Sequence, residues 1–249
     1  MTPSSTLKPP HSRCFYPAAS AALLVLTFIG FRLFYLQGQA YPGRPLTPPI
    51  RVLLIVHGVS MTAWMILSVV QSMLVAVNRK QLHRTLGALG ASLAALIVIA
   101  GYLTAVEATR LNPADMKLFG LTSKQFLTVP LTGVVMFGAF VLTGVLNRRR
   151  PEVHRPMMFM ASMSTIAAAM GRIAVLNDWY AGTRLEHWFS AFLTTLVLGV
   201  VLLVIKWVLE RRFDRWFAGA FGVLAVVCVA ASLGAKTDGW SRLATILAG

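Results

Sequence analysis

The chain has 249 residues, of which 57% are hydrophobic and only 12% are charged, and its mean hydropathy is +0.70. Soluble domains carry about 25% charged residues, so this composition excludes a soluble enzyme and a disordered chain. Two cysteines, Cys14 and Cys228, are too few for the disulfide framework of a secreted scaffold. The sequence therefore predicts an integral membrane protein that crosses the bilayer several times.

The net charge is +15, from 23 Lys and Arg against 8 Asp and Glu. Such a balance can indicate nucleic-acid binding, but the cations here lie in short segments between long apolar runs. Cations that flank membrane spans are expected from topology alone. We therefore expect the lipid bilayer, and no nucleic acid, as the partner of these charges.

Seven apolar runs are long enough to cross the hydrocarbon core, which needs roughly 20 residues. The runs are continuous rather than alternating, which favours helices over the strands of a barrel. The predicted fold is all-α, a polytopic bundle of seven transmembrane helices at about 18–37, 52–77, 85–106, 126–146, 156–176, 187–208 and 216–234.

The predicted domains are a cytoplasmic tail (1–17), the seven-helix transmembrane domain (18–234) and an outer C-terminal tail (235–249). The segment 1–17 is too polar to be the hydrophobic part of a signal peptide. No small-residue cleavage site clearly follows the first apolar run, so we expect that run to stay as a helix.

The distribution of cations orients the bundle, because cytoplasmic segments carry the excess of Lys and Arg. Thirteen cations fall in the N-terminal tail, 78–84, 147–155 and 206–215. Eight fall in 38–51, 107–125, 177–186 and the C-terminal tail. The N-terminus is therefore predicted to be cytoplasmic and the C-terminus outside, in a bacterial inner membrane.

Four of the five histidines each lie on a different predicted helix. His57 and His187 fall near the outer side, whereas His83 and His154 fall where two helices begin on the cytoplasmic side. Ionisable residues at membrane depth are costly and often functional. Imidazole is the commonest metal ligand, and pairs of histidines hold b-type haem iron. We expect these four histidines to bind haem b or, alternatively, a transition-metal ion; a further alternative is that no cofactor binds and the cytoplasmic pair contacts lipid phosphate.

Four arginines accompany the histidines. Arg84 and Arg155 directly follow His83 and His154 in the first turn of their helices, where backbone N–H groups also favour an anion. A lipid headgroup or a haem propionate suits both positions. Arg32 and Arg172 lie within outer apolar runs, where they either extend to the membrane surface or join His57 and His187 at an outer pocket. We include all four as candidate cofactor-binding residues.

Residues 50–175 resemble a group of uncharacterised bacterial multipass membrane proteins. The resemblance is carried by His57-Gly-Val-Ser-Met-Thr-Ala-Trp64, by Gln71, by the His-Arg-x-Leu-Gly motif at His83 and by the His-Arg-x-Met motif at His154, followed by Arg172. Many members have a second histidine two positions before the one that matches His57, where this chain has Ile55. The resemblance implies the membrane fold and no particular activity.

A weaker likeness in layout is to cytochrome b561-type di-haem proteins, which also distribute four histidines over transmembrane helices. In those proteins the four helices are consecutive, whereas here the fourth predicted helix carries no histidine. The likeness is therefore one of ligand arrangement.

Taken together, the residues predict a membrane protein that binds haem or a metal and works in electron transfer, with a membrane protein or a quinone as its partner. Two alternatives stay open. One is a non-redox accessory or assembly subunit whose His-Arg pairs bind lipid headgroups. The other is a metal-dependent membrane enzyme.

Overall fold

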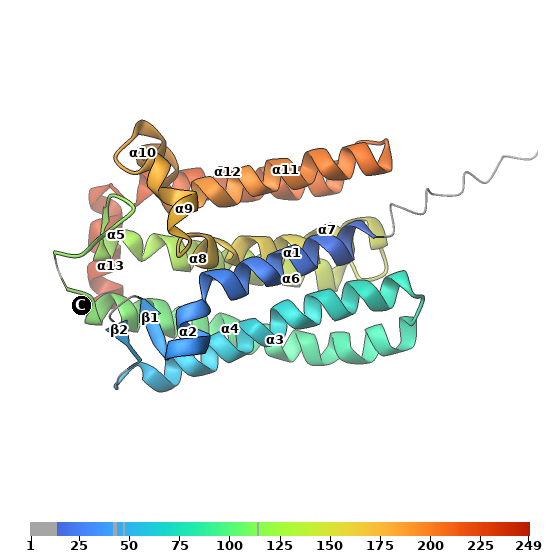
Figure 1. Cartoon of the computed structure of the whole chain (residues 1–249), viewed down its shortest axis with the longest axis horizontal. Helices are drawn as coiled ribbons and strands as arrows, with labels where there is room; N and C mark the ends of the chain where they lie inside the picture. Colours follow the sequence, from blue (N-terminus) through green and yellow to red (C-terminus); the bar gives the residue numbers. More distant parts are fainter. Residues whose placement is uncertain (1–13, 42–43, 47, 114) are drawn as a thin grey trace, which may run out of the picture.

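A computed structural model describes residues 14–41, 44–46, 48–113 and 115–249 of the chain. Most of the predicted N-terminal tail, residues 1–13, lies outside the described residues. Long helices run side by side in alternating directions and make up most of the structure (Figure 1). They are α1 (Phe15–Gly30), α3 (Arg51–Ala76), α4 (Lys80–Leu111), α6 (Thr128–Leu146), α7 (Pro151–Thr165), α11 (Leu193–Glu210) and α12 (Arg215–Gly234).

The length and composition of these helices suit a lipid bilayer. Five helical stretches are long and apolar enough to cross a membrane: Arg51–Ala76, Lys80–Leu111, Ser123–Leu146, Arg184–Glu210 and Arg215–Gly234. A sixth, Pro151–Met170 with Ala174–Tyr180, passes the same test but is bent by 103°. α1 is a shorter apolar helix of 16 residues. The protein is therefore a multi-pass membrane protein.

The two ends of the bundle differ in how the helices are connected. Short turns at 77–79, 147–150 and 211–214 join α3 to α4, α6 to α7, and α11 to α12. All three lie at the end where α1 begins, which we call the turn end (Figure 1, right). The opposite end, which we call the loop end, carries the longer connections and the C-terminal helix (Figure 1, left).

The loop end contains short helices and two small antiparallel hairpins. The hairpins pair β1 (Gln39–Tyr41) with β2 (Arg44–Pro45), and β3 (Lys117–Leu118) with β4 (Leu121–Thr122). The short helices here are α2 (Arg32–Gln37), α5 (Ser123–Phe126), α8 (Ala167–Met170), α9 (Ala174–Asn177), η2 (Asp178–Tyr180), α10 (Arg184–Phe189), η3 (Ser190–Phe192) and α13 (Asp238–Ala248).

The core lies between α6, α7, α1 and α12. Phe137, Met160, Met163 and Phe217 are fully buried there. Unbranched methionine fills irregular gaps, which suits α7 because several helices converge on it. Outward-facing apolar side chains stay exposed, as at Val135 (64%) and on many other positions of the long helices. An outer surface of this kind is suited to lipid rather than water.

The helix boundaries differ from the predicted spans in several places. The first predicted span (18–37) is divided between α1 and α2, and the sixth (187–208) is divided among α10, η3 and α11. α4 begins five residues earlier than predicted and also ends five residues later. α7 begins at Pro151, because proline fits the first turn of a helix, and the chain bends between α8 and α9 instead of continuing to 176. α1 begins at Phe15, so Phe15 to Pro17 belong to the bundle rather than to a tail.

Candidate metal centre

The structure brings His83 and His154 together at the turn end. His83 lies in the first turn of α4 and His154 in the first turn of α7, and each side chain is partly buried. Their ring centroids are 6.1 Å apart and the ring planes are nearly perpendicular, at 88°. Two residues 71 positions apart in the sequence thus form one imidazole pair.

The hydrogen bonding of His154 leaves one ring nitrogen available. Its Nδ1 lies 2.8 Å from the carbonyl oxygen of Gly144 on α6. Because a carbonyl only accepts, Nδ1 carries the proton, and in the neutral ring Nε2 then has a free lone pair. Metal-binding histidines are commonly held in this way by a backbone carbonyl.

His83 is held at its backbone, and one nitrogen of its ring is unpaired within the described residues. Gln71 on α3 donates a hydrogen bond from Nε2 to the carbonyl oxygen of His83 at 3.2 Å. The buried Nδ1 of His83 and the buried Oε1 of Gln71 have no hydrogen-bond partner within the described residues. Buried polar atoms are usually paired, so the unpaired ring nitrogen makes His83 a candidate ligand.

The spacing of the pair fits two imidazoles that share one metal. With metal–nitrogen distances of about 2.0–2.1 Å, shared ligation places ring centroids roughly 5–6.5 Å apart, depending on the N–metal–N angle. If the metal were haem iron, its macrocycle would supply further ligands, and His83 and His154 would be the two protein residues that hold the iron. A free ion needs further ligands, and within the described residues no group of three or more His, Cys, Asp or Glu side chains is placed to hold one.

Arg84 and Arg155 provide positive charge beside the pair. Both side chains are exposed, and both act electrostatically on His83. Neither forms a hydrogen bond or an ion pair within the described part of the chain. Two unpaired guanidinium groups at helix starts are suited to an anion, such as a propionate or a lipid phosphate.

His57, on α3, and Arg172, in the break between α8 and α9, lie elsewhere, toward the loop end. The ring of His57 faces α4 at Gly101, where an added Cβ would lie 3.1 Å from its Cε1. The His57 Nδ1 and the Arg172 Nε are both buried without a hydrogen-bond partner among the residues that the structure describes, and the charge of Arg172 acts on His57. The Arg172 guanidinium lies 4.4 Å from the ring centroids of both Phe31 and Tyr41, and its Nη1 donates to the carbonyl of Ala168 at 2.6 Å.

The other two predicted site residues have separate surroundings. His187 is exposed on α10 and accepts a hydrogen bond at Nδ1 from Lys236 at 3.1 Å. Arg32 is exposed at the start of α2, with Nη1 3.5 Å from the carbonyl of Ile29. Because His57 and His187 have different neighbours, we take only the imidazole pair of His83 and His154 forward as a metal centre.

The sequence analysis counted Lys206 with the cations of 206–215 and Lys236 with those of the C-terminal tail, and it gave Gln125 no role. Lys236 contacts His187 at the loop end, although 49 positions separate the two residues. Lys206 is buried within α11 and forms ion pairs with Glu210 and Asp214. Only Gln125 carries a local signal, because Thr122 three residues earlier makes a capping box with it.

The chain matches no family model, no curated protein sequence and no solved structure. The resemblance based on the His-Arg motifs therefore stays a prediction.

Proposed function

We propose that the chain is a seven-helix protein of a bacterial inner membrane that binds a transition metal, as haem b or as a single ion, and transfers electrons within the membrane. The imidazole pair of His83 and His154, at a centroid distance of 6.1 Å, carries this proposal. When bound, the metal supplies one-electron redox chemistry. The turn end would face the cytoplasm, because most of the cations lie there.

The residues around the pair have distinct parts in this proposal. His154 presents Nε2 because the Gly144 carbonyl fixes its tautomer. Gln71 holds the start of α4, and with it His83, against α3. Arg84 and Arg155 would neutralise anionic groups of the cofactor. A quinone or a membrane protein would exchange electrons with the site.

An absorption spectrum of the purified protein tests the proposal. Protein from haem-replete cells should show a reducible Soret band, or else bound metal by elemental analysis. His83→Ala and His154→Ala should each remove most of the bound metal, because each would leave only one protein ligand. His187→Ala is the matched control and should leave the metal content unchanged. If bound metal were lost only in His187→Ala, the metal centre would instead lie at the loop end.

A second candidate function is that of a non-redox accessory subunit that binds anionic lipid, and the exposed, unpaired side chains of Arg84 and Arg155 favour it. In this case the protein would be colourless and free of metal. Anionic lipid would stabilise the native chain more than it stabilises Arg84→Gln or Arg155→Gln. Arg149→Gln is the control, because an exposed turn charge interacts weakly. Equal effects in all three variants would contradict the lipid function.

A further inference from the structure

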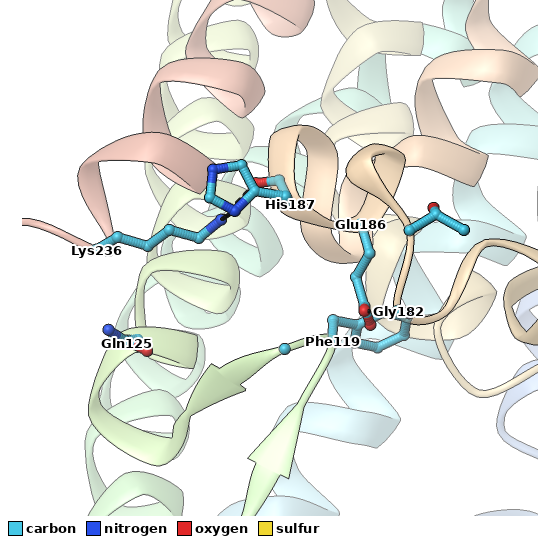
Figure 2. Close-up of a pocket in the computed structure, with 8 residues that line it drawn as sticks. Phe119, Gln125, Gly182, Glu186, His187 and Lys236 are labelled. Atoms are coloured by element: carbon cyan, nitrogen blue, oxygen red, sulfur yellow. Dashed lines mark hydrogen bonds between the residues drawn. The ribbon is translucent and has the colours of Figure 1, made fainter.

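A hollow of about 350 Å³ lies at the loop end, away from the imidazole pair. It is lined by Phe119, Gly120, Gln125, Gly182, Thr183, Glu186, His187 and Lys236 (Figure 2). These residues come from the β3–β4 hairpin, α5, α10 with the turn before it, and the segment after α12. A volume of this size suits a small molecule.

Gln125 lines one side of this hollow. Its Oε1 accepts a hydrogen bond from the backbone N–H of Thr122 at 3.0 Å, as part of the capping box that starts α5. That hydrogen bond engages the oxygen of the Gln125 side-chain amide. The Nε2 group, with two donors, has no partner within the described residues.

Glu186 presents an acceptor on another side of the hollow. Its Oε2 accepts from the backbone N–H of Gly182 at 2.7 Å. Gly182 has a φ of +72°, a conformation that glycine adopts without strain. The second carboxylate oxygen of Glu186 has no partner within the described chain, and the carboxylate forms no ion pair there.

Lys236 supplies the positive charge. Its ammonium donates to both the carbonyl oxygen and the Nδ1 of His187 (Figure 2). An ammonium has three donors, so one is left for a ligand. Because His187 accepts at Nδ1, its neutral ring carries a proton on Nε2. Burial lowers the pKa of Lys236, although the charge of Glu186 raises it in part.

The positive and the negative group therefore share one hollow without neutralising each other. Glu186 and Lys236 interact electrostatically, but they form no salt bridge within the part of the chain described. Within the described residues, Glu186 is held by one hydrogen bond and Lys236 by two, and each can form one more with a ligand. Such preorganisation lowers the cost of ordering side chains when a ligand binds.

From this arrangement we infer that the hollow binds a small zwitterion, with its primary ammonium on Glu186 and its anionic group on Lys236 and Gln125. The ring of Phe119 lines the hollow beside these groups and is itself stacked on Phe126 and Tyr180. Free solutes and ethanolamine-phosphate lipid headgroups share this chemistry. The inference does not depend on the metal centre, which lies at the opposite end of the bundle.

Thermal unfolding of the full chain in detergent with O-phosphoethanolamine tests the inference. The compound should raise the unfolding temperature more than phosphate or ethanolamine alone at the same concentration, because only the zwitterion engages both charges. Lys236→Met and Glu186→Gln should each weaken its binding by about tenfold or more, since each removes a charge-assisted hydrogen bond. Lys117→Met, an exposed lysine of the neighbouring strand outside the hollow, is the matched control and should bind as the native chain does.

Nanodiscs separate the two sources of the ligand. If the headgroup is the natural ligand, discs with phosphatidylethanolamine should abolish the effect of the free compound, and discs with phosphatidylglycerol should not. If a free solute is the ligand, both discs should leave the effect intact. Glu186→Gln keeps the shape of the side chain. If Lys236→Met does not fold, the binding of O-phosphoethanolamine to Glu186→Gln therefore decides the inference. Absence of a shift in the native chain, or equal binding in Glu186→Gln, would overturn the inference.

Discussion

Lys206 is a charged side chain placed deep in an apolar structure, with only 2% of it exposed. Its ammonium pairs with Glu210 one turn later on α11 and lies 3.4 Å from a carboxylate oxygen of Asp214. It also lies 4.8 Å and 4.7 Å from the ring centroids of Phe15 and Tyr16 on α1. The charge thus ties the start of α1 to the turn between α11 and α12.

We expect Glu210→Gln to lower the free energy of unfolding by about 2–3 kcal/mol, because a buried charge loses its nearer partner. Lys206→Met should cost less, about 1 kcal/mol, because the two carboxylates that it leaves unpaired are 15% and 17% exposed and can be hydrated, whereas the Lys206 ammonium, at 2%, cannot. Equilibrium unfolding in mixed detergent micelles, followed by circular dichroism, measures both values.

The ion pair of Glu107 and Arg110 is the control for this prediction. It is short, at 2.6 Å, but its side chains are 37% and 48% exposed. We expect Glu107→Gln to change the free energy of unfolding by less than about 0.5 kcal/mol. Similar losses for Glu107→Gln and Glu210→Gln would show that burial does not set the strength of these pairs.

At the scale of the elements, α1 crosses α8 at a point where only glycine fits. A Cβ at Gly30, the last residue of α1, would lie 2.3 Å from the carbonyl oxygen of Ala169 and 2.7 Å from its Cα. Both are backbone atoms, which cannot turn away as a side chain can. The close approach also supports the bend that follows α8, because α1 packs directly against this segment.

Gly30→Ala should therefore force α1 away from α8 and destabilise the protein by about 1–3 kcal/mol, as overpacking does. Gly219→Ala on α12 is the matched control, because no atom outside its own helix lies within 4 Å of the added Cβ. That change should be neutral or stabilise by up to about 1 kcal/mol. Thermal unfolding of the two variants in one detergent compares them, and equal stability would mean that the helices separate without cost.

At the scale of the whole molecule, the two ends of the bundle carry different amounts of charge. The turn end holds clusters such as Arg148, Arg149 and Arg150, whereas the loop end holds scattered cations and most of the acids. Lys206 is buried in ion pairs, so it does not contribute an exposed charge to the cytoplasmic side. The cations of the predicted cytoplasmic segments then number twelve rather than thirteen, against eight in the outer segments. The direction of the bias is unchanged.

We therefore expect the turn end to be cytoplasmic and the loop end to be outside. Alkaline phosphatase, which is active only outside the cytoplasm, should be inactive when fused after Arg149 and active when fused after Gly249. A cytoplasmic reporter at the same two positions should give the complementary result and serves as the control. The reverse pattern would invert the bundle and place the imidazole pair at the outer face.

The membrane class and most helix positions follow from the sequence alone. α3 and α12 match the predicted spans to within one residue at each end, because a long apolar run in lipid has few alternatives to a helix. The sequence also placed His83 and His154 at the starts of α4 and α7, since cations and a proline mark those turns. These features depend on local composition.

Tertiary structure decided which of these residues meet. His83 and His154 form a pair because α4 and α7 begin at the same end of the bundle, and His57 and His187 do not share their neighbours. The break after α8, the burial of Lys206 and the hollow around Lys236 depend on helices that are distant in the sequence. Hydropathy measures how well a residue suits lipid, but it does not indicate which face of a helix packs against another helix. A site forms only where such helix faces meet, so its residues cannot be identified from hydropathy.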